Sequence, residues 1–331
     1  MRIRLAQYGI AHAHASGKVD AMKRNPDVEF CGIFSPMPID KDNSVYKDVH
    51  CFSSKEEMLE DDSIAGIAVE GHVHENLACA REVIDHGKHV WLDKPAGTDL
   101  NEFHKILAIA KQKGLLVQLG YMFRYNPGFK LIFDALKNGD LGDIFSIRGR
   151  MSTSIPIDRR APLSQYKGGI LFELLCHLID IVVAVLGRPQ KVTSFLRNDL
   201  GVDDEFADNT LAVLEYERAI AVVESAAMEV SPFPCRRFEI YGTRGSVILE
   251  PLEPPSIRLC LSQDSGKYTR GWQDVKIEAL PRYDGELEAF VADIKKEKAP
   301  DRSLYHELIV QETVLRASRN NIGFLLSSIN V

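Results

Sequence analysis

The chain has 331 residues, of which 45% are hydrophobic and 26% charged, and its formal net charge is -7 at pH 7. This length exceeds what one hydrophobic core usually serves, so we expect two domains, and the acidic balance argues against a nucleic-acid-binding surface. The N-terminal apolar run is too short for a signal peptide, and no run approaches the roughly 18 residues of a membrane span. The six cysteines are scattered without a CxxC pair, which is typical of a reducing compartment. We therefore expect a cytoplasmic protein with no membrane association.

Strand-like and helix-like segments alternate through the first 120 residues. The expected strands are 3–8, 28–34, 64–70, 88–92 and 115–120. The expected helices are 13–24, 53–60, 74–86 and 100–113. Alternation with short connections predicts a parallel sheet covered by helices on both faces. Ligands of such sheets bind at the carboxyl ends of the strands.

The pattern changes after residue 122. A helix is expected at 126–138, and most of the following segments are strands joined by turn signals: 144–151, 192–197, 209–216, 219–225, 237–241 and 246–250. Such strands form a mostly antiparallel sheet. Further helices are expected at 170–186, 285–298 and 304–319.

The sequence thus predicts an α/β protein with two domains. Residues 1–122 form the parallel-sheet domain, and residues 123–331 form an α+β domain with a mostly antiparallel open sheet. Because one face of such a sheet usually needs a partner, we expect a homo-oligomer, either a dimer or a tetramer.

The turn after the first strand, Gly9 to His14, is the first candidate site. A dinucleotide-binding fingerprint has glycine at the first, third and sixth places of this turn. Here only Gly9 is glycine; Ala11 is a small substitute and His14 is not small. The turn is therefore either an ordinary strand–helix connection or an anion site at a helix N-terminus, where His12 and His14 can donate hydrogen bonds to a phosphate.

A second candidate is Lys94, which follows a buried strand and precedes Pro95. The carboxyl edge of a sheet is where its ligand lies, although a surface lysine before a loop proline fits the same pattern. The third candidate is the segment 168–186, which is apolar nearly all round. At about 100° per residue, its polar residues Glu173, His177 and Asp180 lie within roughly 60° of one another. They form either a satisfied structural network or an acid/base group that lines a cleft.

Together these segments resemble the Gfo/Idh/MocA family of glucose-fructose oxidoreductases and inositol 2-dehydrogenases, over nearly the whole chain. Asp93-Lys94-Pro95 stands where the family has Glu-Lys-Pro, and 120–127, with Arg124, is similar to its crossover into the second domain. Residues 168–180 resemble its glycine-rich helix motif, with the three polar residues in register. Residues 208–210, the turn 242–246 and the last two helices also fit.

The resemblance implies a Rossmann-type N-terminal domain and hydride transfer between NAD or NADP and a hydroxyl or carbonyl of a sugar, inositol or similar polyol. It implies three catalytic residues. Lys94 would touch the nicotinamide ribose and the reacting oxygen, with a cis bond before Pro95. His177 would be the general acid/base, and Glu173 would bind substrate and orient His177, with Arg124 as a further substrate contact. The implied cofactor contacts are Gly9, Ala11, His12, Ala13, His14, Ser35, Glu70, Gly71, His74, Asp93, Lys94 and Met122.

The chain departs from the family pattern in its glycine-poor turn, in the shorter Asp93, and at Ser35. An NAD-preferring relative would have an acid at Ser35, and its absence removes repulsion of a 2′-phosphate. We therefore expect NADP(H) to be tolerated at least as well as NAD(H), although the nearest base after Ser35 is Lys41.

Three other functions fit parts of the sequence. A regulatory sensor would bind dinucleotide without turnover, but it would need neither Lys94 nor His177. A redox-assisted glycoside hydrolase would cycle a tightly held NAD. A zinc site is an alternative use of four histidines in two HxH pairs, His12, His14, His72 and His74. Helix-capping and phosphate-binding roles explain these histidines more simply, so we expect no metal.

Overall fold

The computed structural model describes residues 2–296 and 302–320. They divide into two compact units, one of residues 2–122, 281–296 and 302–311 and the other of residues 123–280 and 312–320. The boundary after residue 122 coincides with the expected one.

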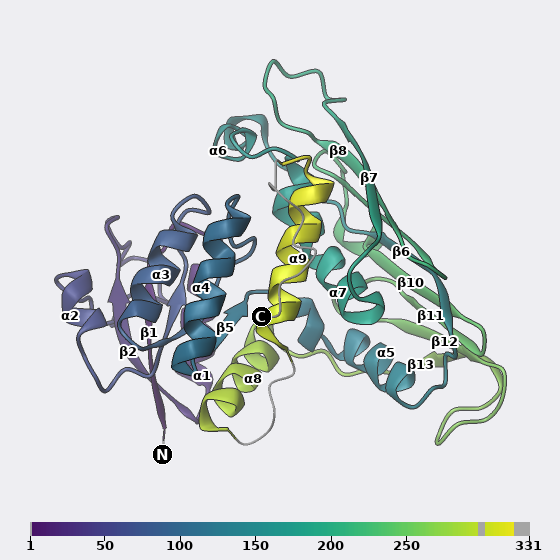
Figure 1. The fold of residues 1–331 in the computed structure, drawn as a ribbon, viewed down its shortest axis with the longest axis horizontal. Coiled ribbons are helices and arrows are strands. Elements are labelled where there is room, and N and C mark those ends of the chain that lie inside the picture. The colour runs from purple at the N-terminus through teal and green to yellow at the C-terminus, as the bar shows by residue number, and fades with distance from the viewer. Residues whose placement is uncertain (1, 297–301, 321–331) are drawn as a thin grey trace. The chain divides into compact units, whose positions relative to one another are not determined.

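The first unit contains a five-stranded parallel sheet in the order β2-β1-β3-β4-β5 (Figure 1). Its strands are β1 (Ile3–Tyr8), β2 (Val28–Phe34), β3 (Gly66–Val69), β4 (His89–Leu92) and β5 (Val117–Leu119). Its helices are α1 (Ala15–Arg24), α2 (Lys55–Leu59), α3 (Asn76–Asp85), α4 (Leu100–Lys113) and α8 (Asp284–Lys295). The predicted parallel sheet is confirmed, and all four residues of β3 are buried, as in a sheet covered on both faces.

Local signals explain the helix ends in this unit. The Asp99 side chain accepts the Glu102 N–H at the start of α4, and Gly114 ends the helix in the left-handed region at φ 67°. Ser54 caps α2 in the same way by accepting the Glu57 N–H. These caps lie where the sequence places the helix boundaries, to within two residues.

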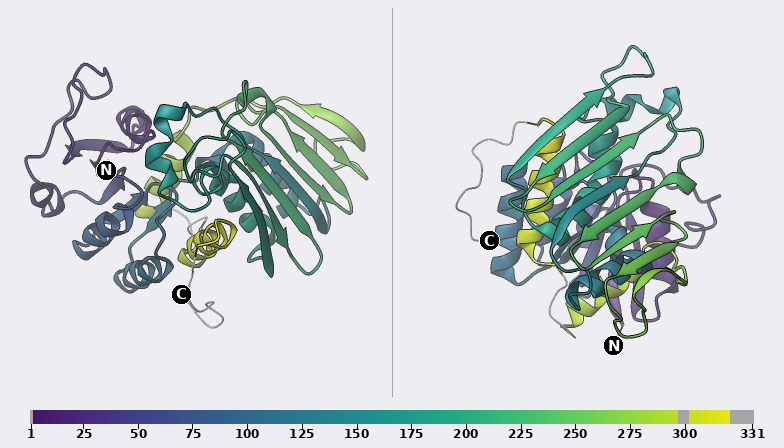
Figure 2. Two further views of the ribbon diagram at one scale, coloured as in Figure 1. Left: turned by 90° about the horizontal axis from the view of Figure 1, so that it is seen from above. Right: turned by 90° about the vertical axis from the view of Figure 1, so that its right-hand side faces the viewer.

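The second unit is built on an eight-stranded sheet in the order β13-β12-β11-β10-β6-β9-β8-β7, whose strands lie side by side in Figure 2. All neighbouring pairs are antiparallel except β6 and β9, which are parallel. The strands are β6 (Ile144–Arg150), β7 (Lys191–Arg197), β8 (Asn209–Glu215), β9 (Ile220–Ala226), β10 (Arg237–Gly242), β11 (Gly245–Leu249), β12 (Ile257–Leu261) and β13 (Gly271–Val275). The mostly antiparallel sheet is confirmed, and β12 and β13 are additions to the predicted strands.

Helices α5 (Pro127–Lys137) and α7 (Cys176–Leu186) also belong to this unit. A Cβ on Gly149 of β6 would lie 2.8 Å from Leu178 Cδ1, so glycine permits the close packing of α7 on the sheet. On β7 the side chains alternate: Ser194 is buried, whereas Phe195 is 57% exposed. This exposed aromatic ring lies opposite Leu211 of β8 on the outer face of the sheet, where a partner stays an expectation.

The expected second domain, 123–331, needs correction because α8 and the first part of α9 (Leu304–Ala317) group with the first unit. Long-range hydrogen bonds explain this. Gln118 Nε2 donates to Glu286 O at 3.1 Å, and Arg302 Nη1 donates to Leu119 O at 2.8 Å. The chain therefore returns to the parallel sheet after the antiparallel one is complete.

Candidate active site

The turn after β1 requires glycine at its first position. Gly9 has φ +89°, and a Cβ on it would lie 2.9 Å from Gly71 N and 3.1 Å from Glu70 O. The His12 N–H donates to Glu70 O at 3.2 Å, so the turn lies directly against the end of β3. Any larger residue at Gly9 would push the turn away from this strand.

A cavity of about 520 Å³ opens at the carboxyl ends of β1, β2 and β3. Predicted cofactor residues from three separate segments of the chain line it: Gly9, Ala11, Ser35, Gly71 and His74. Parallel sheets bind their ligands at this edge. The structure therefore brings these five residues together around a space suited to part of a dinucleotide.

The charged residues around this cavity oppose the tolerance of NADP(H) that Ser35 alone predicts. Glu82 of α3 and Glu75, which precedes this helix, line it, and its lining residues include no lysine or arginine. Lys41 is held elsewhere, because its Nζ donates to Val49 O at 2.8 Å. Lys55 forms an ion pair with Glu82 at 2.6 Å. Carboxylates at this cavity disfavour a further phosphate group there, although the ion pair with Lys55 offsets part of the charge of Glu82.

Three other predicted cofactor residues form a separate cluster. His12 Nδ1 lies 2.5 Å from Asp93 Oδ2, and His14 Nδ1 lies 3.0 Å from Asp93 Oδ1. Burial opposes ionisation of Asp93, but the two imidazoles hold its pKa well below the usual range. Burial lowers the pKa of His14 to about 4, so its ring is neutral at pH 7. Asp93 therefore joins the turn after β1 to the end of β4.

A buried charged layer lies next to this cluster. Lys18 Nζ is 2.5 Å from Glu70 Oε1 and 3.9 Å from Asp93 Oδ1, and the three side chains are 0% exposed. Burial opposes the charge on Lys18, but Glu70, Asp93 and Glu286 raise its pKa, so it stays protonated. Burial raises the pKa of Glu70 to about 7. The Glu70 carboxylate is paired within this layer. A contact between Glu70 and a cofactor, as predicted, would therefore involve the Glu70 backbone.

Glu286 of α8 carries a prediction about pH. Burial raises its pKa from 4.5 to about 7, although Lys18 and Arg302 oppose the shift. The fold thus favours the protonated carboxyl, whose stabilising contribution is complete below pH 4.5 and is lost as the pH rises through 7. The difference between the two pKa values corresponds to about 3 kcal/mol. Glu286→Gln should therefore flatten the fall in melting temperature between pH 5 and pH 8.

The exposed Glu288 lies on the same helix and provides the control. Glu288→Gln should leave the pH dependence of the melting temperature as in the wild type. Parallel melting curves for wild type and Glu286→Gln across this pH range would show that Glu286 is ionised in the fold.

Lys94 lies in a tightly held segment that follows β4. The peptide bond between Lys94 and Pro95 is cis, as the resemblance implies. Asn76 Nδ2 donates to Asp93 O and to Pro95 O, each at 3.3 Å, on both sides of the lysine. Burial is the main cause of the lowered pKa of His14, and the charge on Lys94 adds to the lowering.

In the second unit, the expected helix 170–186 begins with a π-helical turn at Leu171–Leu175 and continues as α7. The predicted helix is therefore present, with a π-helical first turn. Gly168 and Gly169 have φ of 95° and 51°, and the Ile170 N–H donates to Ala207 O at 2.9 Å. This contact fixes the start of the turn that carries Glu173. π-Helical turns are frequent at functional sites.

The polar residues of this segment have different surroundings. Asp180 is fully buried and forms an ion pair with Arg124, whose Nε lies 3.3 Å from Asp180 Oδ2. The structural interpretation therefore applies to Asp180. The His177 ring stands nearly perpendicular to that of Phe123, with 5.3 Å between centroids. Because Arg124 is paired with a buried carboxylate, its predicted substrate contact stays a prediction.

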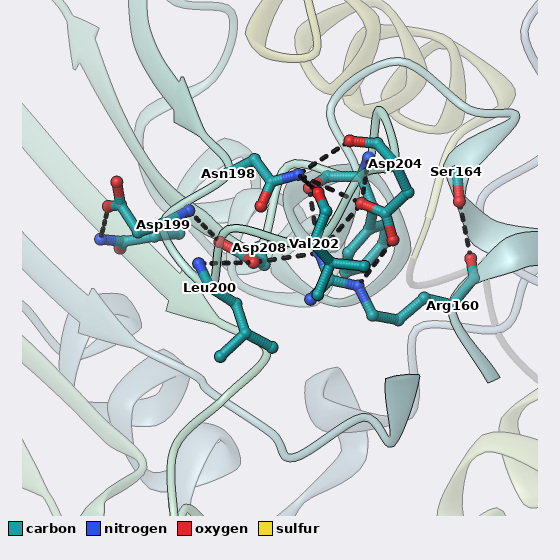
Figure 3. A network of polar contacts seen from close by, with 10 residues as sticks. Arg160, Ser164, Asn198, Asp199, Leu200, Val202, Asp204 and Asp208 are labelled. Atoms are coloured by element: carbon teal, nitrogen blue, oxygen red, sulfur yellow. Dashed lines mark hydrogen bonds and ion pairs between the residues drawn. The ribbon is translucent and has the colours of Figure 1, made fainter. Parts of the chain in front are cut away.

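Arg160 holds a loop that the sequence analysis did not identify (Figure 3). It is 1% exposed and forms ion pairs with Asp204 and Asp208, each at 3.0 Å. Asp208 also accepts the Asp199 N–H at 2.8 Å. The loop between these residues includes Ala207, whose carbonyl fixes the start of the π-helical turn. The only sequence signal was Asp208 in the family-like segment 208–210.

The predicted site residues belong to both units. Ala13 lies in the turn after β1, and Met122 is a buried residue at the end of the first unit. Lys94 belongs to the first unit, and His177 and Glu173 belong to the second. Joint action of these three residues in one reaction stays a prediction.

Comparison with known families decides the classification. Residues 8–121 match the oxidoreductase family with an NAD-binding Rossmann fold, and residues 129–248 match the GFO/IDH/MocA C-terminal domain. The chain belongs to the Gfo/Idh/MocA oxidoreductase family. None of the described helices is both long and apolar enough to cross a membrane.

Individual relatives are distant. The chain is 27% identical over 207 residues to the uncharacterized oxidoreductase YhhX of Escherichia coli K12, an alignment that covers 62% of this chain and 58% of YhhX. It is 23% identical over 273 residues to a myo-inositol 2-dehydrogenase of Thermotoga maritima, which covers 77% and 75% of the two chains. The alignments thus span about three fifths of the length of YhhX and of YrbE from Bacillus subtilis.

Solved structures share the fold over nearly the whole chain. The probable oxidoreductase YhhX has a TM-score of 0.80 at 21% identity, covering 96% of this chain and 97% of YhhX. The UDP-N-acetylglucosamine 3-dehydrogenase GnnA of Acidithiobacillus ferrooxidans has a TM-score of 0.80 at 15% identity, covering 97% and 98%. At such identities the likeness establishes the fold alone.

Proposed function

We propose that this protein transfers a hydride between a nicotinamide dinucleotide and a hydroxyl or carbonyl carbon of a sugar, inositol or similar polyol. The observation that carries the proposal is the cavity at the carboxyl ends of β1, β2 and β3, within the part of the chain that matches an NAD-binding domain. A relative named as a myo-inositol 2-dehydrogenase supports the substrate class.

The residues of the first unit fit a dinucleotide. At Gly9, any Cβ would fill the space beside the backbone. Ala11, Ser35 and Gly71 line the adjacent space. These residues would hold the cofactor, and the cluster of His12 and His14 on Asp93 would fix the turn. The nicotinamide ring, when bound, supplies the hydride acceptor or donor.

The proposed chemistry of this chain is proton transfer and charge stabilisation. In the oxidation direction, His177 removes the proton of the substrate hydroxyl. Lys94 stabilises the negative charge that develops on that oxygen. Glu173 binds the substrate and orients His177. In the reduction direction the same histidine returns the proton to the oxygen.

Dinucleotides are expected to raise the melting temperature, because a ligand that binds only the folded state stabilises it. We expect a larger shift with NAD and NADH than with NADP and NADPH, since Glu75 and Glu82 line the cavity without a basic partner for a 2′-phosphate. Thermal shift with the four dinucleotides checks both expectations. Four null results at millimolar concentration would contradict binding, and a preference for NADP(H) would restore the expectation drawn from Ser35.

A screen of polyols and sugars with each cofactor, followed by nicotinamide absorbance, tests the reaction itself. Net reduction of the cofactor by a polyol supports the dehydrogenase. Hydrolysis of a glycoside without net reduction would favour the redox-assisted hydrolase, and binding without any turnover would favour the sensor.

We also propose that the protein is cytoplasmic and forms a homo-oligomer through the outer sheet face at Phe195.

A further inference from the structure

Two imidazoles and one carboxylate converge in the first unit. The Nδ1 atoms of His12 and His14 both face the carboxylate of Asp93, at 2.5 and 3.0 Å. One donor atom from each residue lies within 4.8 Å of the other two. The Asp93 side chain is 0% exposed, whereas the histidine side chains are 13% and 18% exposed. The cluster is thus closed on the carboxylate side and open to solvent on the histidine side.

The backbones that carry these donors are held in place independently of the side chains. The His12 N–H donates to Glu70 O at 3.2 Å, and the Asp93 N–H donates to Val69 O at 3.1 Å, so both segments are fixed to β3. Behind the carboxylate, Lys18 Nζ lies 3.9 Å from Asp93 Oδ1. This distance is that of an ion pair and is too long for a hydrogen bond.

We propose that His12, His14 and Asp93 bind one divalent transition-metal ion. Two imidazoles and a carboxylate form a donor set that suits ions such as Zn²⁺, Co²⁺ and Fe²⁺, whereas Mg²⁺ and Ca²⁺ prefer oxygen ligands alone. On binding, each Nδ1 gives a lone pair to the ion and its proton moves to Nε2 or to solvent. The remaining coordination positions face the open side and take water or an anionic ligand.

The neighbouring pair of histidines serves as an internal comparison. His72 and His74 have the same spacing, but their rings stack on each other 5.4 Å apart. Among the residues that the structure describes, only the cluster on Asp93 brings three such donors together. The structure therefore brings His12 and His14 together with Asp93. The alternative considered from sequence was a zinc site formed by these two histidines with the second HxH pair.

Titration of the full chain with Co²⁺ tests the proposal, after treatment with a chelator and in the absence of dinucleotide. We expect one equivalent of Co²⁺ to produce the visible absorption of an ion bound by protein ligands. Zn²⁺ should abolish this absorption by displacement, and Mg²⁺ should not. His14→Ala and Asp93→Asn should each weaken Co²⁺ binding by about tenfold or more, and His72→Ala should leave it unchanged.

The absence of Co²⁺ absorption, or an equal loss in His72→Ala, would overturn the proposal. Because substitutions at Asp93 risk unfolding, X-ray absorption of the wild-type Zn²⁺ form gives a second readout. Two imidazole ligands on the zinc ion support the site. Four imidazole ligands, or a sulfur ligand, contradict it. None of these measurements depends on turnover, so the outcome is separate from that of the proposed hydride transfer.

Discussion

Replacing His177 with asparagine is expected to lower turnover per folded molecule by about 10² to 10⁴, the usual contribution of a positioned acid/base group. The asparagine amide preserves hydrogen bonding in a similar volume but does not accept a proton at neutral pH. Melting temperature and dinucleotide affinity should therefore change little. Turnover with the best substrate of the screen, measured beside thermal shift, checks this expectation.

Asp180, one turn further along the same buried segment, is the matched control. Its carboxylate pairs with Arg124 in the buried interior, so Asp180→Asn should lower the melting temperature. Turnover per folded molecule should be largely spared. If His177→Asn behaved like Asp180→Asn, losing stability while keeping turnover, His177 would be a structural group and the proposed proton transfer would be wrong.

The parallel sheet was predictable because its signals are local and agree with one another. The strands are buried on both faces and read as short apolar runs, and α4 has a capping aspartate at Asp99 and a stop at Gly114. By contrast, β13 lies at the edge of its sheet, carries the polar residues Gln273 and Asp274, and has no buried residue. Such an edge strand forms because β12 offers it hydrogen bonds, which sequence periodicity does not record.

The position of the cavity was predictable for a similar reason, since the carboxyl ends of neighbouring parallel strands share one edge. Gly9, Ser35 and Gly71 each follow one of these strands, so the sequence predicts that they lie at this edge, and they line one cavity. Contacts between residues far apart in the sequence could not be predicted. The contact of His14 with Asp93 spans 79 residues. The π-helical turn depends on a carbonyl of Ala207, which no helical periodicity between 170 and 186 encodes.

Replacing Lys94 with methionine is expected to lower turnover by about 10² to 10³, through loss of the charge beside the reacting oxygen. Methionine keeps most of the side-chain volume, and the 1% exposed ammonium no longer needs compensation in the interior. The melting temperature is measured beside turnover, so that the loss is expressed per folded molecule. Removal of this cation should also raise the pKa of His14, because Lys94 contributes to its lowering. A histidine titration followed by NMR checks that second effect without any turnover.

Replacement of Lys88, just before β4, is the control that distinguishes a loss of catalysis from a loss of stability. It is also buried, but its Nζ donates to the carbonyls of Asp61 at 2.7 Å and Ile64 at 3.1 Å. Lys88→Met leaves these carbonyls without their donor, so it should lower the melting temperature and spare turnover. Lys94→Met should instead lower turnover per folded molecule. A double variant of Lys94 and His177 that loses much less than the product of the single effects would indicate that the two residues act as one unit. Full activity in Lys94→Met would remove the lysine from the mechanism while leaving the family and the fold as they stand.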